Sequence, residues 1–123
     1  MTYSVQTSPE FRRVRDLPRR VSWAADISKR LTGELSHTPP PWSLHEVQAQ
    51  ALFDILKQGG ALLPICAGGG KTLISLLAPY LLGAKRPILF LPAALIAKTH
   101  AERAELAKYW RIPLNIRLFS YEM

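Results

Sequence analysis

Cysteine, acidic side chains and long apolar runs are all scarce in this chain of 123 residues. The single cysteine, Cys66, excludes an internal disulfide and favours a reducing compartment. No apolar stretch approaches the ~20 residues that a membrane-spanning helix needs. The polar, arginine-rich start also lacks the apolar segment of a signal peptide. We therefore expect a soluble protein of the cytoplasm, or of a host cytoplasm if the gene is viral.

The shortage of acidic residues leaves a basic protein. Sixteen Lys and Arg side chains face nine Asp and Glu, which gives a net charge of +7. Such a balance favours an anionic partner, namely a nucleotide or nucleic acid. The basic segment 11–15 could lie along a phosphate backbone, although a solvated terminus explains it as well. The 48% of hydrophobic residues suffices for the core of one small domain.

The most informative stretch is Ile65–Thr72, which reads Ile-Cys-Ala-Gly-Gly-Gly-Lys-Thr. Apolar residues 61–65 precede it and predict a buried parallel strand, and the apolar residues from Leu73 onward predict a helix. Glycines let a backbone approach a polyphosphate closely, and a helix N-terminus attracts anions. The pattern departs from G-x-x-x-x-G-K-[ST] at Ile65, where the pattern has glycine.

A phosphate-binding loop of this kind assigns a role to each residue. Lys71 is expected to reach the β- and γ-phosphates of ATP and Thr72 to place its hydroxyl on Mg²⁺, so these two are the candidate catalytic residues. The expected cofactor-binding residues are Gln48, Ala67, Gly68, Gly69, Gly70, Lys71 and Thr72. A simple glycine-rich turn with an exposed lysine is the alternative interpretation.

Three successive prolines at 39–41 predict a boundary between two parts of the chain. Residues 1–41 are expected to form a basic extension with a short helix, which starts near Pro18 and stops at Gly33. Residues 42–123 are expected to form the core.

The core is expected to open with a helix. Ser43 and Glu46 have the spacing of a capping box, and an apolar stripe then continues to the stop signal at 59–60. The expected inward positions are Leu44, Val47, Ala51, Leu52, Ile55 and Leu56. Gln48 lies on this helix, and its amide offers the donor and the acceptor that the Hoogsteen edge of adenine requires. A glutamine on a helix is usually only a polar surface residue, so its assignment as a cofactor-binding residue rests on the family resemblance given below.

Further along, residues 87–92 and 112–119 predict two more strands, with a helix over 92–110 between them. Its inward positions should be Leu95, Thr99, Leu106 and Trp110. Alternating strands and helices imply a parallel sheet, and hence an α/β fold with the nucleotide at the carboxyl ends of the strands.

Together, Leu44–Gln48 and Gly68–Thr72 resemble the opening of a superfamily-2 helicase or translocase, of the DEAD/DEAH-like kind. The resemblance covers about residues 42–123, with His45 where the family has arginine. It implies the first part of a RecA-like ATP-binding domain that couples ATP hydrolysis to movement on DNA or RNA. The strand ending at Pro92 resembles motif Ia of the family. This likeness assigns single-strand contacts, independent of base sequence, to Pro92, Ala93, Ala94 and Lys98.

The chain contains no Asp-Glu-x-His or Asp-Glu-x-Asp pattern to hold Mg²⁺ and polarise water. By the resemblance, the rest of the motor is expected beyond Met123, and the 123-residue chain alone should not hydrolyse ATP. The alternative is a non-catalytic module that serves as a structural or nucleic-acid-binding protein. A small P-loop kinase fits less well, because Gln48 would then have no role.

Overall fold

A computed structural model describes residues 5–18, 24–63, 65 and 70–122. Five α-helices, two 3₁₀ helices and two strands occupy these residues, a mixture of helix and sheet that is compatible with an α/β fold. In chain order they are η1 (Val5–Thr7), α1 (Pro9–Arg15), α2 (Ala24–Leu35), α3 (Glu46–Gln58), α4 (Lys71–Leu82), β1 (Ile88–Leu91), η2 (Ala93–Leu95), α5 (Ile96–Leu106) and β2 (Arg117–Ser120).

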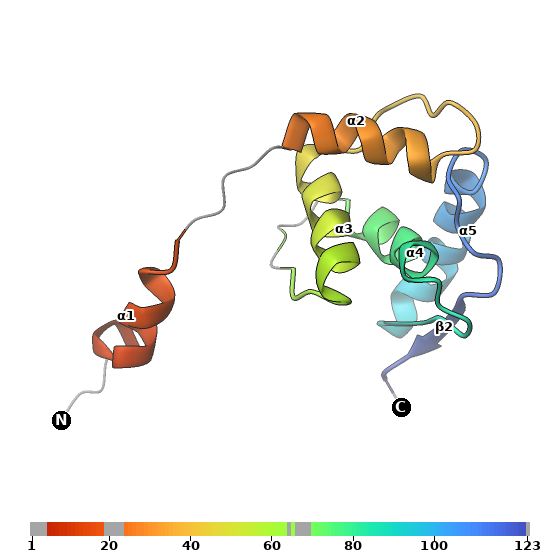
Figure 1. The fold of residues 1–123 in the computed structure, drawn as a ribbon. Coiled ribbons are helices and arrows are strands. Elements are labelled where there is room, and N and C mark those ends of the chain that lie inside the picture. The colour runs from red at the N-terminus through yellow and green to blue at the C-terminus, as the bar shows by residue number, and fades with distance from the viewer. Residues whose placement is uncertain (1–4, 19–23, 64, 66–69, 123) are drawn as a thin grey trace.

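The helices α2 to α5 gather into one body, with the strands at the end opposite α2 (Figure 1). Helix α1 is drawn apart from this body, and none of its residues is buried. Ser8 starts α1, because its Oγ accepts the Phe11 N–H at 3.1 Å and Pro9 follows as the first helical residue. The basic segment predicted to meet phosphate is thus an exposed helix of seven residues.

Helices α3 and α4 form the centre of the core. Helix α3 ends at Gly59, as predicted, because this residue adopts φ 75° and its N–H donates to the Ile55 oxygen. The buried side chains of the two helices are Gln48, Ala49, Ala51, Leu52, Ile55, Leu73, Ile74, Leu76 and Leu77. The prediction was wrong for Val47 and Leu56, which are exposed, because the buried face of α3 is centred on Gln48 and Leu52 instead.

Helix α2 differs from its predicted course. It continues through Gly33 to Leu35, since no partner crowds Gly33 and the buried Leu31 and Leu35 hold the last turns on the core. Two of its polar side chains also bind the backbone just ahead of α3. The Ser28 hydroxyl donates to the Leu44 oxygen, and the Thr32 hydroxyl accepts the Leu44 N–H at 3.0 Å.

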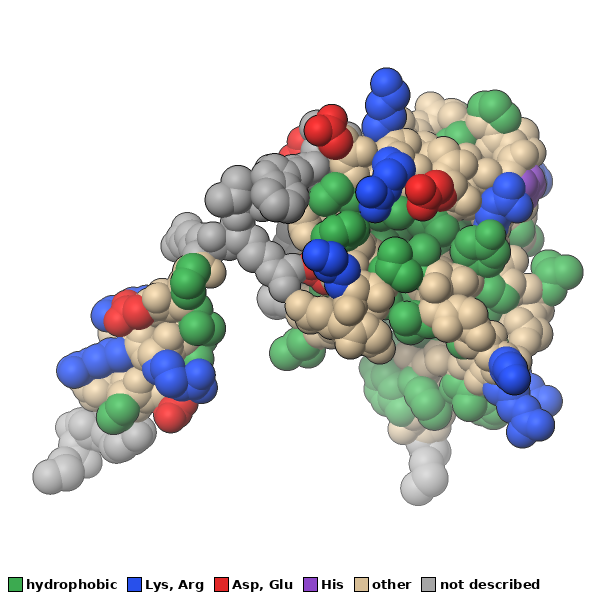
Figure 2. All heavy atoms as spheres, in the orientation of Figure 1, with side chains coloured by type: hydrophobic (Ala, Val, Ile, Leu, Met, Phe, Trp, Pro, Cys, Tyr) green, Lys and Arg blue, Asp and Glu red, His purple; other side chains and the backbone are tan. Residues whose placement is uncertain are grey.

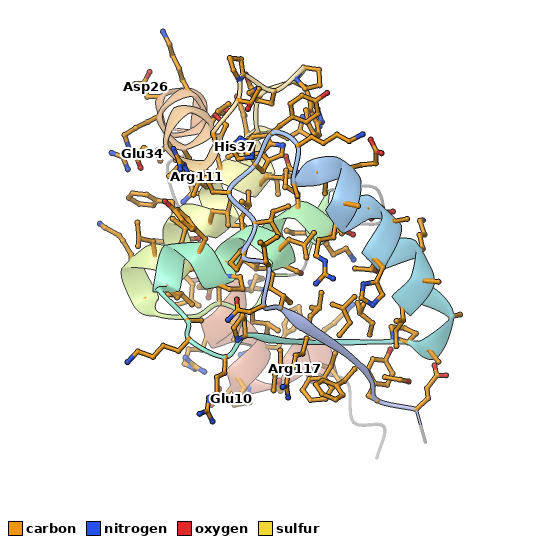
Figure 3. All side chains as sticks on the ribbon, turned by 90° about the vertical axis from the view of Figure 1, so that its right-hand side faces the viewer. Glu10, Asp26, Glu34, His37, Arg111 and Arg117 are labelled. Carbon is orange, nitrogen blue, oxygen red and sulfur yellow. The ribbon has the colours of Figure 1, made fainter. Side chains whose placement is uncertain are left out.

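The segment after α2 is joined to the segment after α5. Ser36 and Trp110 form an isolated antiparallel bridge, and the Arg111 N–H donates to the Leu35 oxygen at 2.8 Å. Imidazole Nε2 of His37 lies 2.8 Å from the Ala107 oxygen (Figure 3). Because Ile27, Leu31 and Leu35 share a hydrophobic cluster with α3 and α4, residues 24–35 are packed onto the 42–123 unit. The boundary at residue 41 itself stays a prediction.

The two strands pair in parallel, as predicted, with Ile88 opposite Arg117 and Phe90 opposite Phe119. Strand β2 starts later than the predicted 112, because Pro113 and the 92% exposed Leu114 lie in a turn before it. A strand was also predicted over 61–65. Of these residues the structure describes 61–63 and 65, and none of them forms a strand. A strand needs a paired neighbour, and in the described sheet β1 and β2 pair only with each other. The Ile65 N–H donates instead to Leu63, two residues back.

The predicted helix over 92–110 is also shorter than expected. It divides into η2 and α5 and ends at Leu106, and Leu95 is exposed, whereas Thr99 and Trp110 are buried as predicted. Across the described ranges, no helix combines the length and apolar character that spanning a membrane requires.

Candidate nucleotide-binding site

The start of α4 is shaped by Gly70. This residue has φ 78° and ψ 32°, a left-handed conformation that side chains other than glycine's rarely adopt. A Cβ at Gly70 would lie 2.0 Å from Nε2 of Gln48, closer than atoms can approach. Glycine is therefore required twice here, by the backbone angle and by the neighbouring side chain. The turn places Lys71 and Thr72 in the first turn of α4, where the backbone N–H groups are free of helix partners.

Gln48 connects the start of α3 to the start of α4. Its side chain is 5% exposed, its Oε1 accepts the His45 N–H at 2.9 Å, and its Nε2 donates to the Gly70 oxygen at 3.2 Å. Helix α3 therefore begins later than predicted. The side chain that accepts the backbone N–H at its start is that of Gln48, and not that of Glu46 as the predicted capping box required. A glutamine amide has two acceptor sites and two N–H groups. Among the described residues, one acceptor site and one N–H are used here, by the bonds to His45 and Gly70.

A pocket of about 710 Å³ opens beside these residues. It is lined by Trp42, His45, Gln48, Gly70, Lys71, Thr72, Leu73, Lys98, Ala101, Glu102, Glu105 and Leu106. Four of the predicted cofactor-binding residues, Gln48 and Gly70 to Thr72, thus line one cavity. So does Lys98, which was predicted to contact nucleic acid.

The other predicted site residues lie elsewhere. Ala67, Gly68 and Gly69 fall outside the described residues. Pro92 precedes η2, which carries the exposed Ala93 and Ala94, and the Leu95 N–H donates to the Pro92 oxygen at 2.9 Å. These three do not line the pocket. The structure therefore separates the predicted phosphate site from the predicted single-strand contacts, with Lys98 on the pocket side.

Two carboxylates, Glu102 and Glu105, line the pocket, and each forms an ion pair with a nearby lysine. Lys98 Nζ lies 3.7 Å from Glu102, and Lys108 Nζ lies 3.0 Å from Glu105. The hydrogen bond and the charge of Glu105 raise the pKa of Lys108 above its usual value. Within the described ranges, no three His, Cys, Asp or Glu side chains gather as a metal site.

Sequence reasoning missed Trp42, His45, Glu102 and Glu105 as pocket residues. The helical spacing of Lys98, Glu102 and Glu105 was visible, since the three lie on one face of α5 at i, i+4 and i+7. The position of Trp42 in the pocket could not be predicted from the sequence, because it depends on an edge-to-face contact with Trp110, whose ring centre lies 5.7 Å away.

Comparisons of the chain with protein-family models, curated proteins and solved structures gave no match. The likeness to superfamily-2 helicases consequently rests on the motifs themselves.

Proposed function

We propose that this chain binds ATP together with Mg²⁺ at the N-terminus of α4, as the ATP-binding part of a superfamily-2 helicase or translocase with a RecA-like fold. The observation that carries the proposal is the convergence of Gln48, Gly70, Lys71 and Thr72 on one pocket. These residues come from two separate segments of the chain, the first turn of α3 and the start of α4. The contact between Gly70 and Gln48 adds support, because it holds the starts of α3 and α4 together at the pocket.

Each residue has a role that its position supports. Lys71 is exposed and follows Gly70 directly, so its ammonium can meet the β- and γ-phosphates. Thr72 offers a hydroxyl to Mg²⁺ from the same turn. The remaining donor and acceptor of Gln48 can pair with adenine. Ala67, Gly68 and Gly69 complete the loop by resemblance to the family.

The partner proposed with ATP is single-stranded DNA or RNA, contacted without regard to base sequence. Lys98 is 71% exposed on its side chain and belongs to the pocket, and Pro92, Ala93 and Ala94 lie one turn earlier. A strand held by η2 and the start of α5 would reach the nucleotide pocket through Lys98, since Pro92, Ala93 and Ala94 do not line it. Lys98 is then the residue through which strand binding and nucleotide binding would be coupled.

One observation favours the alternative, a binding module without catalysis. Both carboxylates of the pocket, Glu102 and Glu105, lie in exposed ion pairs with lysines, and the sequence has no Asp-Glu-x-His or Asp-Glu-x-Asp pattern to polarise water. The chain of 123 residues should then bind ATP without turning it over, with or without single strands. Both readings expect no turnover from the 123-residue chain, and a phosphate-release assay with oligonucleotide present tests this expectation: stimulated turnover by the purified chain would exclude the non-catalytic module.

The binding proposal is tested by calorimetric titration of ATP with Mg²⁺ into the chain and its Lys71→Ala variant. Loss of the ammonium should weaken binding by about 2 kcal/mol or more, since hydrogen bonds to charged groups are the stronger ones. Lys29→Ala removes an equal charge from an exposed position on α2 and should bind ATP normally. Equal affinity of a folded Lys71→Ala variant would refute the proposal.

A further inference from the structure

Helix α2 holds the residue that precedes the N-cap of α3 by both of its backbone groups. The Ser28 hydroxyl donates to the Leu44 oxygen, and the Thr32 hydroxyl accepts the Leu44 N–H at 3.0 Å. Ser28 and Thr32 are four positions apart, so they lie on the same face of α2. Ser28 is buried and Leu44 is only 3% exposed, which shields these bonds from water. Two directed bonds to one residue fix both the position and the orientation of its backbone.

The outer face of α2 carries charges instead. Figure 2 shows Lys, Arg, Asp and Glu side chains over this helix, with hydrophobic side chains below them. Arg30 and Glu34, for example, form an exposed ion pair with a separation of 3.7 Å. Ser28 and Thr32 face the opposite way, toward the interior that also receives Leu31. The two hydroxyl groups of α2 that bind Leu44 are therefore directed at the body of the molecule and not at solvent.

The peptide unit between Leu44 and His45 carries the contact onward. Its oxygen accepts from Ser28, and its N–H, which belongs to His45, donates to Oε1 of Gln48 at 2.9 Å. A peptide group is planar, and its C=O and N–H point in opposite directions. A bond that orients the oxygen therefore orients the N–H as well. A change at Ser28 reaches Gln48 through this peptide.

The Gln48 amide connects this peptide to the start of α4. Its Oε1 meets the His45 N–H, and its Nε2 donates to the Gly70 oxygen at 3.2 Å. An N–H only donates and a carbonyl oxygen only accepts, so one orientation of the amide alone satisfies both partners. The Gly70 oxygen belongs to the peptide whose N–H is that of Lys71, the first residue of α4. This N–H has no partner within the helix, so it is the kind of group that binds anions at a helix N-terminus.

The donors in this series all point the same way. The Ser28 hydroxyl donates to the first peptide, the His45 N–H to Gln48, and the Gln48 amide to the second peptide. Hydrogen bonds arranged head to tail polarise one another, by about 10–30% per bond. The donor end of the series is the Lys71 N–H. Each bond in the series therefore strengthens the group that the proposed nucleotide site offers to phosphate.

We propose that Ser28 and Thr32 are positioning residues for the nucleotide-binding turn at the start of α4, and that they act through Leu44 and Gln48. The inference rests on the proposed nucleotide site and adds α2 to its construction. Neither Ser28 nor Thr32 lines the pocket, so their action is indirect. The bonds to Leu44 fix the Gln48 amide, and the amide fixes the Gly70 carbonyl. Removal of the Ser28 hydroxyl should therefore weaken nucleotide binding from a distance.

The first test follows the hydrogen bonds themselves by NMR, without nucleotide. In the unmodified chain, the His45 N–H and the Gln48 side-chain amide should exchange with solvent at least about 10-fold more slowly than free amides. Ser28→Ala should speed both by about 5-fold. Ser36→Ala is the matched control, because its hydroxyl donates to the Thr32 oxygen at 2.6 Å and lies outside the series. Exchange at the rate of free amides in the unmodified chain would overturn the proposal, as would equal acceleration by the two variants.

The second test separates positioning from general stability. ATP affinity is measured by calorimetry for the unmodified chain, Ser28→Ala, Gln48→Ala and the double variant. Ser28→Ala should weaken binding by about 5-fold, the scale of one hydrogen bond. With Gln48→Ala already present, the same change should weaken binding by less than about 2-fold, because its path to α4 is cut. A role in stability alone does not depend on Gln48, so equal losses in both backgrounds would refute the positioning role.

Thr32 supplies the variants to use if Ser28→Ala does not fold. Thr32→Val keeps the shape of the side chain and removes the acceptor of the Leu44 N–H, whereas Thr32→Ser retains a hydroxyl. The valine variant should weaken ATP binding and speed exchange at Gln48. The serine variant should return both to within about 2-fold of the unmodified chain. If serine does not restore what valine loses, the methyl group and not the hydroxyl is responsible, and the proposal is wrong.

The positioning role can fail independently of the proposed nucleotide site. Suppose that exchange at His45 and Gln48 responds to Ser28→Ala and not to Ser36→Ala, but that the chain does not bind ATP. This result would refute the nucleotide proposal and leave the hydrogen-bonded series established. A chain that binds ATP equally well with and without the Ser28 hydroxyl would refute the positioning role alone.

Discussion

The two ends of this molecule use their side chains in opposite ways. Where α3 meets α4, Gln48 is buried and bonded to two backbone groups, and Gly70 leaves no room for a further atom. At the sheet, Phe90 and Phe119 are exposed on strands with one paired neighbour each. The first end is closed by contacts within the chain, whereas the second presents groups that no described residue covers. A ligand at the first end therefore has to fit a built cavity.

The largest expected effect is on the free energy of unfolding, which should fall much more when a core leucine is truncated than when a sheet phenylalanine is truncated. Leu76 is fully buried in α4, so Leu76→Ala should lower the free energy of unfolding by about 2–5 kcal/mol. Phe90→Ala removes a larger side chain but one already exposed to water, and should cost less than about 0.5 kcal/mol. Urea denaturation of both variants measures the difference. Similar losses would show that the sheet face is covered in solution.

A smaller effect is expected at the glycine between Gln48 and α4. Gly70→Ala should destabilise the chain by about 2–3 kcal/mol, because it combines a left-handed backbone with displacement of the Gln48 amide. Thermal and urea unfolding report this loss. The variant should also bind ATP more weakly, since the turn that presents Lys71 changes.

Gly33 supplies the matched control for that substitution. It lies inside α2 with open space around its Cα, so Gly33→Ala should stabilise the chain by about 0.5–1 kcal/mol. Destabilisation of the same size at both glycines would mean that the close contact at Gly70 does not matter.

An effect smaller than that at Gly70 is expected in the choice of nucleotide. If Gln48 contacts adenine, the unmodified chain should prefer ATP to GTP, and Gln48→Ala should narrow that gap by about 1–2 kcal/mol. Competition titrations with the two nucleotides measure the gap. Because the variant also leaves the His45 N–H and the Gly70 oxygen without their partner, its unfolding free energy should be measured alongside. Equal affinity of the unmodified chain for ATP and GTP would assign Gln48 a structural role only.

Local signals predicted the elements that depend on local chemistry. The stop of α3 at Gly59, the helix that follows Gly70 and the strand ahead of Pro92 were all read from neighbouring residues, and the structure contains them. The parallel pairing of β1 with β2 was also predicted, since a helix between two strands returns the chain in the same direction.

The misplaced elements depend on contacts between distant residues. Residues 61–65 have the composition of a strand, but composition cannot supply a paired neighbour. Helix α2 continues past Gly33 because Leu35 is buried against the core. The residues around Gly33 alone could not predict this burial. In the site, Gln48 was chosen for its amide, yet its bonds to His45 and Gly70 follow only from the packing of α3 on α4. The grouping of Glu102 and Glu105 with Lys71 required the fold for the same reason.

The junction between the segment after α2 and the segment after α5 has a consequence for the order of folding. His37 contacts the backbone of Ala107 across 70 positions of sequence, and Ser36 and Leu35 bind residues just beyond it. During synthesis, α2 emerges early but its last turn has no docking partner until residues 107–111 have been made. Contacts of such sequence separation slow folding, because a long loop must close before they form. The buried face of α2 can therefore pack on α3 early, whereas the bonds that fix its C-terminal end form only after residues 107–111 have left the ribosome.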